Sequence, residues 1–315
     1  MSDETPVLDA VYALAASPAF ATDGICFAAA NTGVFRSQDG GHTWRYALDS
    51  LSLQSPLPTS AVAVSPTFTA DHSVFAGSAG GVLRSSDGGD TWQVSMLPPP
   101  PPMALAFAIS PRFAEDGVLL VGTMEDGVFR SGDRGLHWSR WNFGLLDLHI
   151  LAMAITTTYA EDETLLVGTE SGIFRSTNGG RAWREVEFPI EYAPVLSVAL
   201  SPQYASDGTI FAGTEDHGLF VSQDRGKTWR RLAEGLIAGP VNGLVLAPDF
   251  PHHPYVLAML DSALLVSRDG GQSWGAWEAP LPDNVAGLSA VLAPLGLEPG
   301  APLLLGRMEG GVLRI

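Results

Sequence analysis

One eight-residue pattern recurs through the chain, and it limits the possible folds more than any other feature of the sequence. Its form is Ser-x-Asp-x-Gly-x-x-Trp, with Asn178 in place of the aspartate in the fourth copy. The copies are Ser37 to Trp44, Ser85 to Trp92, Ser131 to Trp138, Ser176 to Trp183, Ser222 to Trp229 and Ser267 to Trp274. A pattern that returns at a steady interval predicts an array of similar units.

Each copy has the composition of a tight turn between two strands. Serine and aspartate side chains bond to nearby backbone N–H groups, and glycine adopts dihedral angles that other residues avoid. An apolar run such as Val82-Leu83-Arg84 precedes each copy, and a tryptophan with a short extended run follows it. The sequence therefore predicts strand, turn and strand around every copy.

A second repeated feature gives the number of units. Apolar alternating runs end in a small residue and a proline, except that the fourth run ends in threonine. The marker residues are Pro18, Pro66, Pro111, Thr157, Pro202, Pro248 and Pro294. Their spacing of 45 to 48 residues gives seven units against six copies of the turn pattern.

Each unit contains four expected strands, which in the second unit are Ala61 to Ser65, Ser73 to Gly77, Gly81 to Arg84 and Thr91 to Met96. Four-stranded units of this length are typical of a β-propeller. We therefore expect an all-β chain whose residues 1–315 form a single seven-bladed domain. The sequence shows no sustained 3.6-residue periodicity, so almost no helix is expected.

The seventh unit is expected to be incomplete. Its third strand matches Gly311 to Ile315, and its turn pattern and fourth strand are missing. We therefore expect the segment from Ser2 to Leu8 to close the ring by supplying a strand to blade 7.

Charge and composition exclude several classes of function. The formal net charge is −17, which argues against binding to nucleic acid or to anionic membrane surfaces. The single cysteine, Cys26, allows no internal disulfide. The start of the chain is acidic and lacks the features of a secretion signal, and no apolar run is long enough to span a membrane, so we expect a cytoplasmic protein. No metal-ligand spacing or phosphate-binding loop is evident, and no cofactor is expected.

The turn pattern, the period and the strand order resemble those of the Asp-box (bacterial neuraminidase repeat) propellers over essentially the whole chain. The phrase from Ser110 to Gly117, echoed from Ser201 to Gly208, looks like bacterial members of this group. The superfamily includes sialidases, xyloglucan-cleaving hydrolases, sortilin-type receptors and a photosystem II assembly factor, so the fold does not give the function. The resemblance implies that each box is a structural turn away from the active face. Calcium at Asp39 or its equivalents is the alternative, although one carboxylate per turn is few for this ion.

The candidate site lies on the face opposite the boxes, where the loops between second and third strands meet the connections between blades. Acidic residues gather in these loops, and two aromatic residues lie in the connection between the third and fourth blades. The candidate binding residues are Glu125, Asp126, Glu170, Glu215, Asp216, His217, Asp261, Glu309, Trp141 and Phe143. The acidic loops would attract a cation, a basic peptide or a basic protein, or they are ordinary surface turns of an acidic protein. The aromatic residues would contact a partner, or they are buried between blades.

Two functions follow from these residues. The first is a non-catalytic binding or assembly scaffold that presents this face to a protein partner, with a place in a larger complex suggested by the resemblance to the assembly factor. The alternative is a glycan-active or glycan-binding protein, for which two of the carboxylates would have to lie about 5 Å apart for retention or about 6.5–9.5 Å apart for inversion. A sialidase is disfavoured because most of the arginines occupy one repeat position or lie in or beside the boxes. The sequence does not indicate an oligomeric state.

Overall fold

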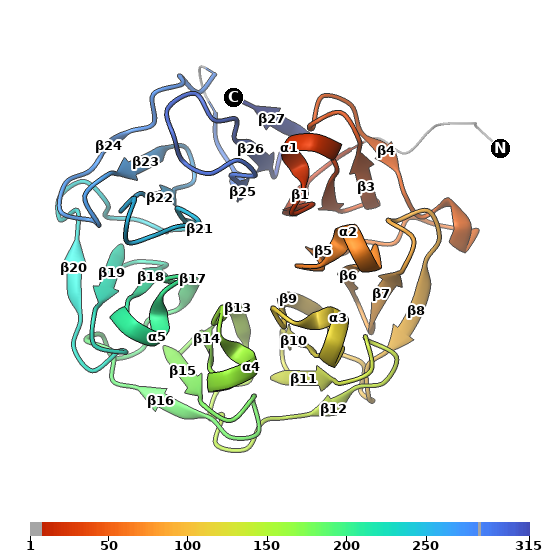
Figure 1. Cartoon of the computed structure of the whole chain (residues 1–315), viewed down its shortest axis with the longest axis horizontal. Coiled ribbons are helices and arrows are strands. Elements are labelled where there is room, and N and C mark those ends of the chain that lie inside the picture. Colours follow the sequence, from red (N-terminus) through yellow and green to blue (C-terminus); the bar gives the residue numbers. More distant parts are fainter. Residues whose placement is uncertain (1–7, 283–284) are drawn as a thin grey trace.

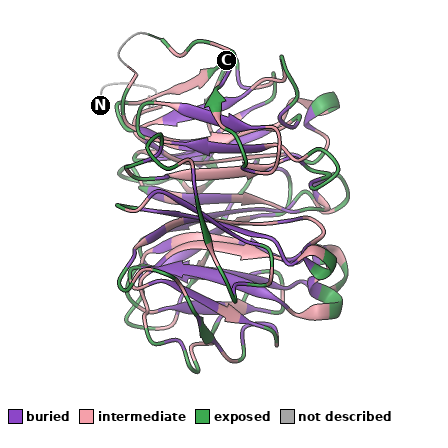
Figure 2. Ribbon diagram, turned by 90° about the vertical axis from the view of Figure 1, so that its left-hand side faces the viewer, coloured by how far each residue is buried: buried purple, intermediate pink, exposed green. Residues whose placement is uncertain are grey.

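The computed structural model describes residues 8–282 and 285–315, which form a ring of seven blades around a central channel (Figure 1). The predicted all-β, seven-bladed propeller is confirmed. Every blade is an antiparallel sheet in which the strands follow chain order from the channel outwards. Figure 2 shows the same blades from the side, with buried strands and exposed loops at both edges.

Within residues 8–282 and 285–315, six blades have four strands and the seventh has three. The strands of blades 1 to 4 are β1 (Val11–Ala16), β2 (Cys26–Ala30), β3 (Gly33–Ser37), β4 (Arg45–Tyr46), β5 (Thr59–Val64), β6 (Val74–Ser78), β7 (Gly81–Ser85), β8 (Gln93–Met96), β9 (Ala104–Ile109), β10 (Leu119–Thr123), β11 (Val128–Ser131), β12 (Ser139–Arg140), β13 (Ile150–Ile155), β14 (Leu165–Thr169), β15 (Ile173–Ser176) and β16 (Arg184–Val186). Those of blades 5 to 7 are β17 (Val195–Leu200), β18 (Ile210–Thr214), β19 (Leu219–Ser222), β20 (Arg230–Leu232), β21 (Gly243–Leu246), β22 (Val256–Met259), β23 (Leu264–Ser267), β24 (Gly275–Ala276), β25 (Leu288–Leu292), β26 (Leu304–Arg307) and β27 (Val312–Arg314).

The structure has little helix, as expected, and the helix that it has lies mainly in the loops after the inner strands. Five of these loops contain one helical turn, namely α1 (Phe20–Asp23), α2 (Phe68–Asp71), α3 (Phe113–Asp116), α4 (Tyr159–Asp162) and α5 (Tyr204–Asp207), and a 3₁₀ turn, η1 (Asp49–Leu51), follows β4. Four residues are too few to show a helical period. Side chains close each turn: Ser17 Oγ donates to Asp23 Oδ2 (2.6 Å), and Asp23 Oδ1 accepts from the Ile25 N–H (2.9 Å).

The Asp-boxes are self-contained hydrogen-bonded turns, as predicted. In the second box, Ser85 Oγ accepts from the Gly89 N–H at 2.8 Å. Asp87 Oδ1 accepts from the N–H groups of Asp90 (3.1 Å) and Thr91 (2.9 Å), and Thr91 Oγ1 donates to the second carboxylate oxygen (2.5 Å). Both oxygens of Asp87 are therefore engaged within the turn, which favours the structural interpretation over a calcium site.

Arginines of the third strands tie one blade to the box of the next. Arg36 Nη1 donates to the Gly88 carbonyl at 2.6 Å, and its other terminal nitrogen lies 2.7 Å from the Asp90 carboxylate. Arg314 reaches from blade 7 to the Gly40 carbonyl of blade 1 at 3.2 Å, which is the same position in a box. Arg36, Arg175 and Arg314 thus link one blade to the next, including the pair that closes the ring, whereas Arg84 donates to Gln93 of its own blade.

Blade 7 consists of β25, β26 and β27. The expected closing strand, Ser2 to Leu8, lies almost entirely outside the described residues. Of the neighbouring residues, Asp9 accepts a hydrogen bond through its carbonyl from the Gly311 N–H at 3.3 Å. On the inner side, Ser289 Oγ of β25 donates to the Val11 carbonyl of β1 at 2.5 Å. Blades 7 and 1 are therefore connected both near the central channel and further out in the ring.

The second strand of most blades carries a glycine where the next blade approaches. A Cβ placed on Gly168 would lie 2.5 Å from the carbonyl oxygen of Val195, which is backbone of the next inner strand. A Cβ on Gly77 would lie 2.8 Å from the Ala104 carbonyl oxygen in the same arrangement. Neither glycine has a positive φ. The constraint at these positions is therefore space between blades.

We predict that Gly168→Ala lowers the free energy of unfolding by about 1–3 kcal/mol, because the added methyl group overlaps backbone that cannot rotate away. Urea denaturation monitored by tryptophan fluorescence measures the change. Gly275→Ala is the matched control, since a Cβ on this strand residue meets nothing within 4 Å. Equal losses in the two variants would contradict the packing explanation.

The boxes also predict how stability depends on pH. Burial raises the pKa of Asp269, but hydrogen bonds from Ser273, Ser267 and Gln272 outweigh it and lower the pKa to about 2. The folded pKa lies below the unfolded value of about 3.9, so this carboxylate stabilises the fold above about pH 4 and loses that contribution as the pH falls towards 2. Asp269→Asn should therefore make the free energy of unfolding fall less steeply over this interval.

Urea denaturation at closely spaced pH values tests this dependence. The fourth box supplies the reciprocal variant, because Asn178→Asp introduces an aspartate at the equivalent position and should make the decline steeper. A slope between pH 4 and 2 that neither substitution changes would show that the box carboxylates do not contribute to acid unfolding.

Candidate binding groove on the loop face

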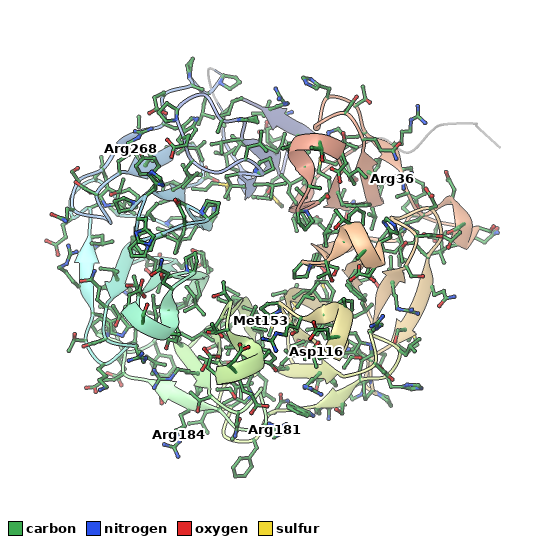
Figure 3. All side chains as sticks on the ribbon, viewed as in Figure 1. Arg36, Asp116, Met153, Arg181, Arg184 and Arg268 are labelled. Atoms are coloured by element: carbon green, nitrogen blue, oxygen red, sulfur yellow. The ribbon has the colours of Figure 1, made fainter. Side chains whose placement is uncertain are left out.

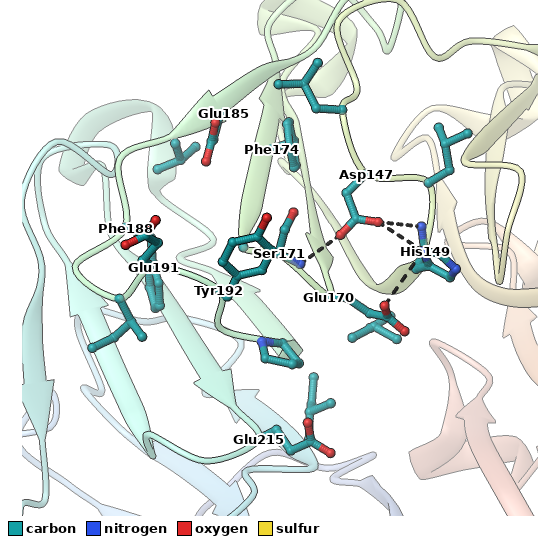
Figure 4. A pocket seen from close by; sticks show the side chains of 18 of the residues that line it. Asp147, His149, Glu170, Ser171, Phe174, Glu185, Phe188, Glu191, Tyr192 and Glu215 are labelled. Atoms are coloured by element: carbon teal, nitrogen blue, oxygen red, sulfur yellow. Dashed lines mark hydrogen bonds and ion pairs between the residues drawn. The ribbon is translucent and has the colours of Figure 1, made fainter.

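A groove of about 1580 Å³ crosses blade 4 on the face opposite the helical turns (Figure 4). Its carboxylates are Glu125, Asp147, Glu170, Glu185, Glu187, Glu191 and Glu215. Its apolar lining is Leu146, Leu148, Leu151, Phe174, Val186, Phe188, Pro189, Ile190, Tyr192, Pro194 and Leu196, and His149, Ser171 and Gly172 complete it. We call this set the blade-4 groove. It runs radially, because it includes residues of the inner strands β13 and β17 and of the outer strand β16.

A difference in loop length accounts for the position of the groove. The loop between β14 and β15 has three residues, 170–172, whereas the equivalent loops of blades 3 and 5 have four, 124–127 and 215–218. In blade 3 the Asn142 side chain also fills the space beneath the loop, accepting from the Val128 N–H (2.8 Å) and donating to the Asp126 carbonyl (2.7 Å). The groove thus coincides with a loop that is one residue shorter than the equivalent loops of both neighbouring blades.

Asp147 connects two segments of the groove by hydrogen bonds. Its Oδ2 accepts from the Ser171 N–H at 2.8 Å, and its Oδ1 accepts from the His149 N–H at 3.0 Å (Figure 4). Burial raises the pKa of Asp147, but the hydrogen bonds from His149 and Ser171 outweigh it and hold the pKa below its usual range. Asp147 is therefore an ionised residue that positions the loop.

His149 lies between two carboxylates at the side of the groove. Its Nδ1 is 3.2 Å from Asp147 Oδ1 and 3.8 Å from Glu170 Oε2. It is the only lining residue that can carry a positive charge, since neither lysine nor arginine is part of the groove. The groove therefore has a negative potential, which low-dielectric walls concentrate.

In the part of the chain that the structure describes, some carboxylates outside the groove form ion pairs with arginines, whereas the carboxylates in its lining do not. Within residues 8–282 and 285–315, five arginine–carboxylate pairs occur, and none of their carboxylates lines the groove. By contrast, the side chains of Glu125 and Glu215 make no hydrogen bond or ion pair in this part of the chain. The arginines labelled in Figure 3, such as Arg181 and Arg268, lie towards the outside of the ring. Within the described chain the groove carboxylates thus have no arginine partner, and His149 is the cation beside Asp147 and Glu170.

Two large apolar side chains at the edge of the groove point into solvent. Leu146 is 80% exposed and Tyr192 is 77% exposed. Tyr192 also has a φ of 55°, in the left-handed region that a bulky residue rarely adopts. Such residues cluster at ligand-binding sites, where the surrounding structure maintains the strain.

The structure brings three of the predicted site residues into one groove, namely Glu125, Glu170 and Glu215. The other predicted residues lie outside its lining: Asp126, Asp216, His217, Asp261, Glu309, Trp141 and Phe143. Asp126 forms an ion pair with Arg140 at 3.1 Å. A binding role for these residues stays a prediction.

The two aromatic candidates have different surroundings. Trp141 lies between guanidinium groups, with the Arg130 carbon 4.5 Å and the Arg181 carbon 5.4 Å from its ring centroid. Phe143 is 81% exposed, and its carbonyl accepts from the Trp183 N–H at 2.8 Å. Trp141 is therefore held within the contact between blades 3 and 4, whereas the Phe143 ring is available to solvent.

Sequence reasoning missed the other half of the groove. Asp147, His149, Glu191 and Tyr192 lie in the connections before β13 and before β17, and Glu185 lies on an outer strand. A signal was present in the connection after β16, residues 187–194, which combines two glutamates with Phe188 and Tyr192. These side chains come from separate segments of the chain. They meet in one groove only because the ring places those segments side by side.

The described part of the chain contains no group of three histidine, cysteine, aspartate or glutamate side chains placed to hold a metal ion. Nor does it contain a helix long and apolar enough to cross a membrane. The carboxylates of the groove are distributed along its length.

No family model matches the chain, and no curated protein matches it. Solved structures do. A GH74 enzyme from Niastella koreensis is 16% identical with a TM-score of 0.78, over 98% of this chain and 53% of that one. YCF48 bound to a D1 peptide is 16% identical with a TM-score of 0.73, over 99% of this chain and 94% of that one. The extracellular domain of a one-component system from B. thetaiotaomicron is 14% identical with a TM-score of 0.71, over 99% of this chain and 39% of that one.

The chain shares the seven-bladed propeller fold of these proteins. At such low identity the similarity shows the fold alone. The chain spans about half of the GH74 enzyme, about two fifths of the extracellular domain, and almost all of YCF48.

Proposed function

We propose that this protein is a non-catalytic binding scaffold whose blade-4 groove holds a segment of a protein partner. The observation that supports this function most strongly is the combination of unpartnered carboxylates with exposed apolar side chains in one open groove. Glu125 and Glu215 offer charge, and Leu146 and Tyr192 offer surface that a partner could bury. Exposed aromatic residues beside a concave site are frequent sites of strong contact in protein interfaces.

The size of the groove also favours a polypeptide. Pockets for small ligands have volumes of about 300–1,000 Å³, and this groove, at about 1580 Å³, is larger and open. Among the structural neighbours, YCF48 is a propeller of similar length that is seen with a bound peptide. A role in holding together a larger complex is the form of this function that we favour.

A glycan-binding or glycan-cleaving role is the second candidate, and the similarity to GH74 enzymes favours it. The groove has carboxylates and the exposed ring of Tyr192, on which a sugar could stack. A glycosidase, however, needs one carboxyl group with a raised pKa to act as general acid. Asp147 does not suit that role, because hydrogen bonds from His149 and Ser171 hold its pKa below the usual range.

We predict that the variant Leu146→Ser/Tyr192→Asn loses its protein partner. The partner is captured from lysate of the source organism, identified, purified and recombined with the wild-type protein, and its dissociation constant is then measured. Removing both exposed side chains should weaken binding about tenfold or more, since each loses the surface it would bury. Asparagine is chosen because it tolerates the left-handed conformation of residue 192.

Leu136→Ser/Leu236→Ser is the matched control, because these side chains are exposed and apolar but lie outside the groove. It should bind the partner as the wild type does. If the control loses the partner and the groove variant keeps it, the groove is the wrong surface. If no purified protein recombines with the wild type while xyloglucan oligosaccharides bind, the glycan function replaces the scaffold.

A further inference from the structure

We propose that two copies of this protein associate through β8, the outer strand of blade 2, which pairs with the β8 of the second copy in an antiparallel arrangement. This inference goes beyond the proposed scaffold function and is independent of the blade-4 groove. The observations that support it are the length of β8 and its lack of charge, the direction of its backbone groups, and the apolar side chains that it exposes.

β8 differs from the outer strands of the other blades. It has four residues, whereas β4, β12, β16, β20 and β24 have two or three. Four of these shorter strands contain arginine, namely Arg45, Arg140, Arg184, and Arg230 with Arg231. β8 has no charged residue, and none occurs between Asp90 and Arg112. Short length and charged side chains commonly protect the edge of a sheet against pairing with another chain, and β8 has neither protection.

The outer side of β8 has backbone groups available for another strand. Successive residues of a strand direct their N–H groups to opposite sides. The Leu97 N–H points inwards, to the loop before β7 at 3.2 Å, and the Trp92 N–H points outwards, to Ser50 Oγ at 3.1 Å. By this alternation the N–H and C=O groups of Val94 and Met96 point outwards. β8 is the last strand of its sheet within the described residues, and it lies at the rim of the ring (Figure 1).

The side chains of Val94 and Met96 form an exposed apolar strip along β8. Val94 is 51% exposed and Met96 is 63% exposed. A Cβ placed on Gly81 of β7 would lie 3.6 Å from Val94 Cγ1 and 3.6 Å from Met96 Sδ, so both side chains lie on the same face of the sheet. They remain exposed because this glycine has no side chain that could cover them.

The opposite face of β8 is fixed by the box of blade 3. Ser95 Oγ donates to the Leu136 carbonyl at 3.1 Å and accepts from the indole N–H of Trp138 at 3.0 Å. β8 is therefore held as a strand before any partner binds. Pairing with another strand then requires little ordering of the protein, which favours association.

The limits of the free edge select a second copy in one register. At one end the Trp92 N–H is already engaged, and at the other end Pro98 has no N–H to donate. Between them, Val94 and Met96 are the residues that direct both backbone groups outwards. A two-fold axis through Ser95 places Val94 of each copy opposite Met96 of the other, and each of these pairs exchanges both hydrogen bonds. The same axis brings apolar side chains together in an isologous contact.

The charge of the protein also favours this surface for contact between copies. Two chains that each carry a formal net charge of −17 repel one another, and this repulsion is least opposed to association where the contact itself is uncharged. Salt screens the repulsion, so the dimer becomes tighter as the salt concentration rises. Blade 4 lies apart from β8 in the ring (Figure 1), so both blade-4 grooves stay open in the dimer.

Sedimentation velocity measures this equilibrium with the full chain. One pair of strands with its side chains is a small interface, below about 1,200 Å², so we expect a dissociation constant of about 10–100 µM. Protein concentrations from about 2 to about 500 µM cover this range. Raising the salt from about 50 to about 500 mM should tighten the dimer by about threefold or more.

Two double variants with the same change in charge locate the contact. Val94→Lys/Met96→Lys and the control Leu236→Lys/Met308→Lys each add two positive charges, taking the formal net charge from −17 to −15. The control side chains are also exposed, at 51% and 49%. Lysine on β8 should weaken the dimer about tenfold or more, and the control should change it less than about twofold.

Met96→Pro tests the backbone pairing separately. Proline is tolerated on an edge strand where the N–H faces solvent, so the variant should fold, but it removes a donor that the second copy needs. We expect it to weaken the dimer about tenfold. It also keeps the proposal testable if the double lysine variant proves unstable, and urea denaturation checks the folding of every variant.

Ser95→Cys tests the register. In the proposed dimer the two copies of residue 95 form a non-hydrogen-bonded pair with Cα atoms about 4.5 Å apart, which is within reach of a disulfide. The natural cysteine, Cys26, is buried and serves as the background in the wild-type protein. After oxidation with copper phenanthroline, Ser95→Cys should form a covalent dimer on a non-reducing gel. The control Ser139→Cys, on the exposed outer strand β12, should stay monomeric.

The inference is overturned if the protein is monomeric over the whole concentration range at both salt concentrations. It is also overturned if Val94→Lys/Met96→Lys dimerises like the wild type, or if Ser139→Cys cross-links as completely as Ser95→Cys. A monomeric protein that captures another protein from lysate, and loses it in Val94→Lys/Met96→Lys, would show that the strand of a different partner pairs with β8. The scaffold function is judged separately, by the Leu146→Ser/Tyr192→Asn variant.

Discussion

Close contact between successive blades is the constraint on which the rest of this structure depends. Gly168 and Gly77 leave room for the backbone of the next inner strand, and a side chain there would overlap a carbonyl group that cannot move aside. Because a single blade cannot bury both of its faces, each sheet is stable only between two others. The ring is therefore a cooperative unit, and Arg314 with Ser289 extends the same contacts across the junction of blades 7 and 1.

The two faces of the ring differ in how much they contribute to the stability of the fold. On one face, the Asp-boxes and the helical turns satisfy their own backbone groups, and arginines such as Arg36 use those boxes as anchors for the neighbouring blade. The opposite face contains the loops between second and third strands and the connections between blades, which vary in length and composition. Variation there costs little stability, since the core lies beneath it. The blade-4 groove lies where one such loop is a residue shorter than the equivalent loops of both neighbouring blades.

An acidic protein has to leave some carboxylates unmatched, and their distribution is informative. The box aspartates are engaged within their turns, and acidic residues such as Asp126 pair with arginines. In the groove, Asp147 is used for positioning the loop, whereas Glu125 and Glu215 have no such partner within the described chain. Exposed charge of this kind contributes more to the attraction and orientation of a basic partner than to the stability of the fold. The exposed side chains of Leu146 and Tyr192 would supply apolar contact surface.

The sequence by itself determined the architecture, because both repeats are local patterns and their period implies the number of blades. It also indicated the role of the boxes, since the Ser85 and Asp87 side chains close a turn within their own eight residues. It missed the helical turns, because four residues are too few to show a repeating helical pattern. Only the tertiary structure decided which loop residues form a site. Glu125 and Glu215 are 90 positions apart in the chain and meet in one groove with Tyr192, whereas Asp126, next to Glu125, turns to Arg140 instead. Spacing along a chain predicts which blade a residue occupies, but the direction of its side chain depends on loop length and on contacts made after the ring has closed.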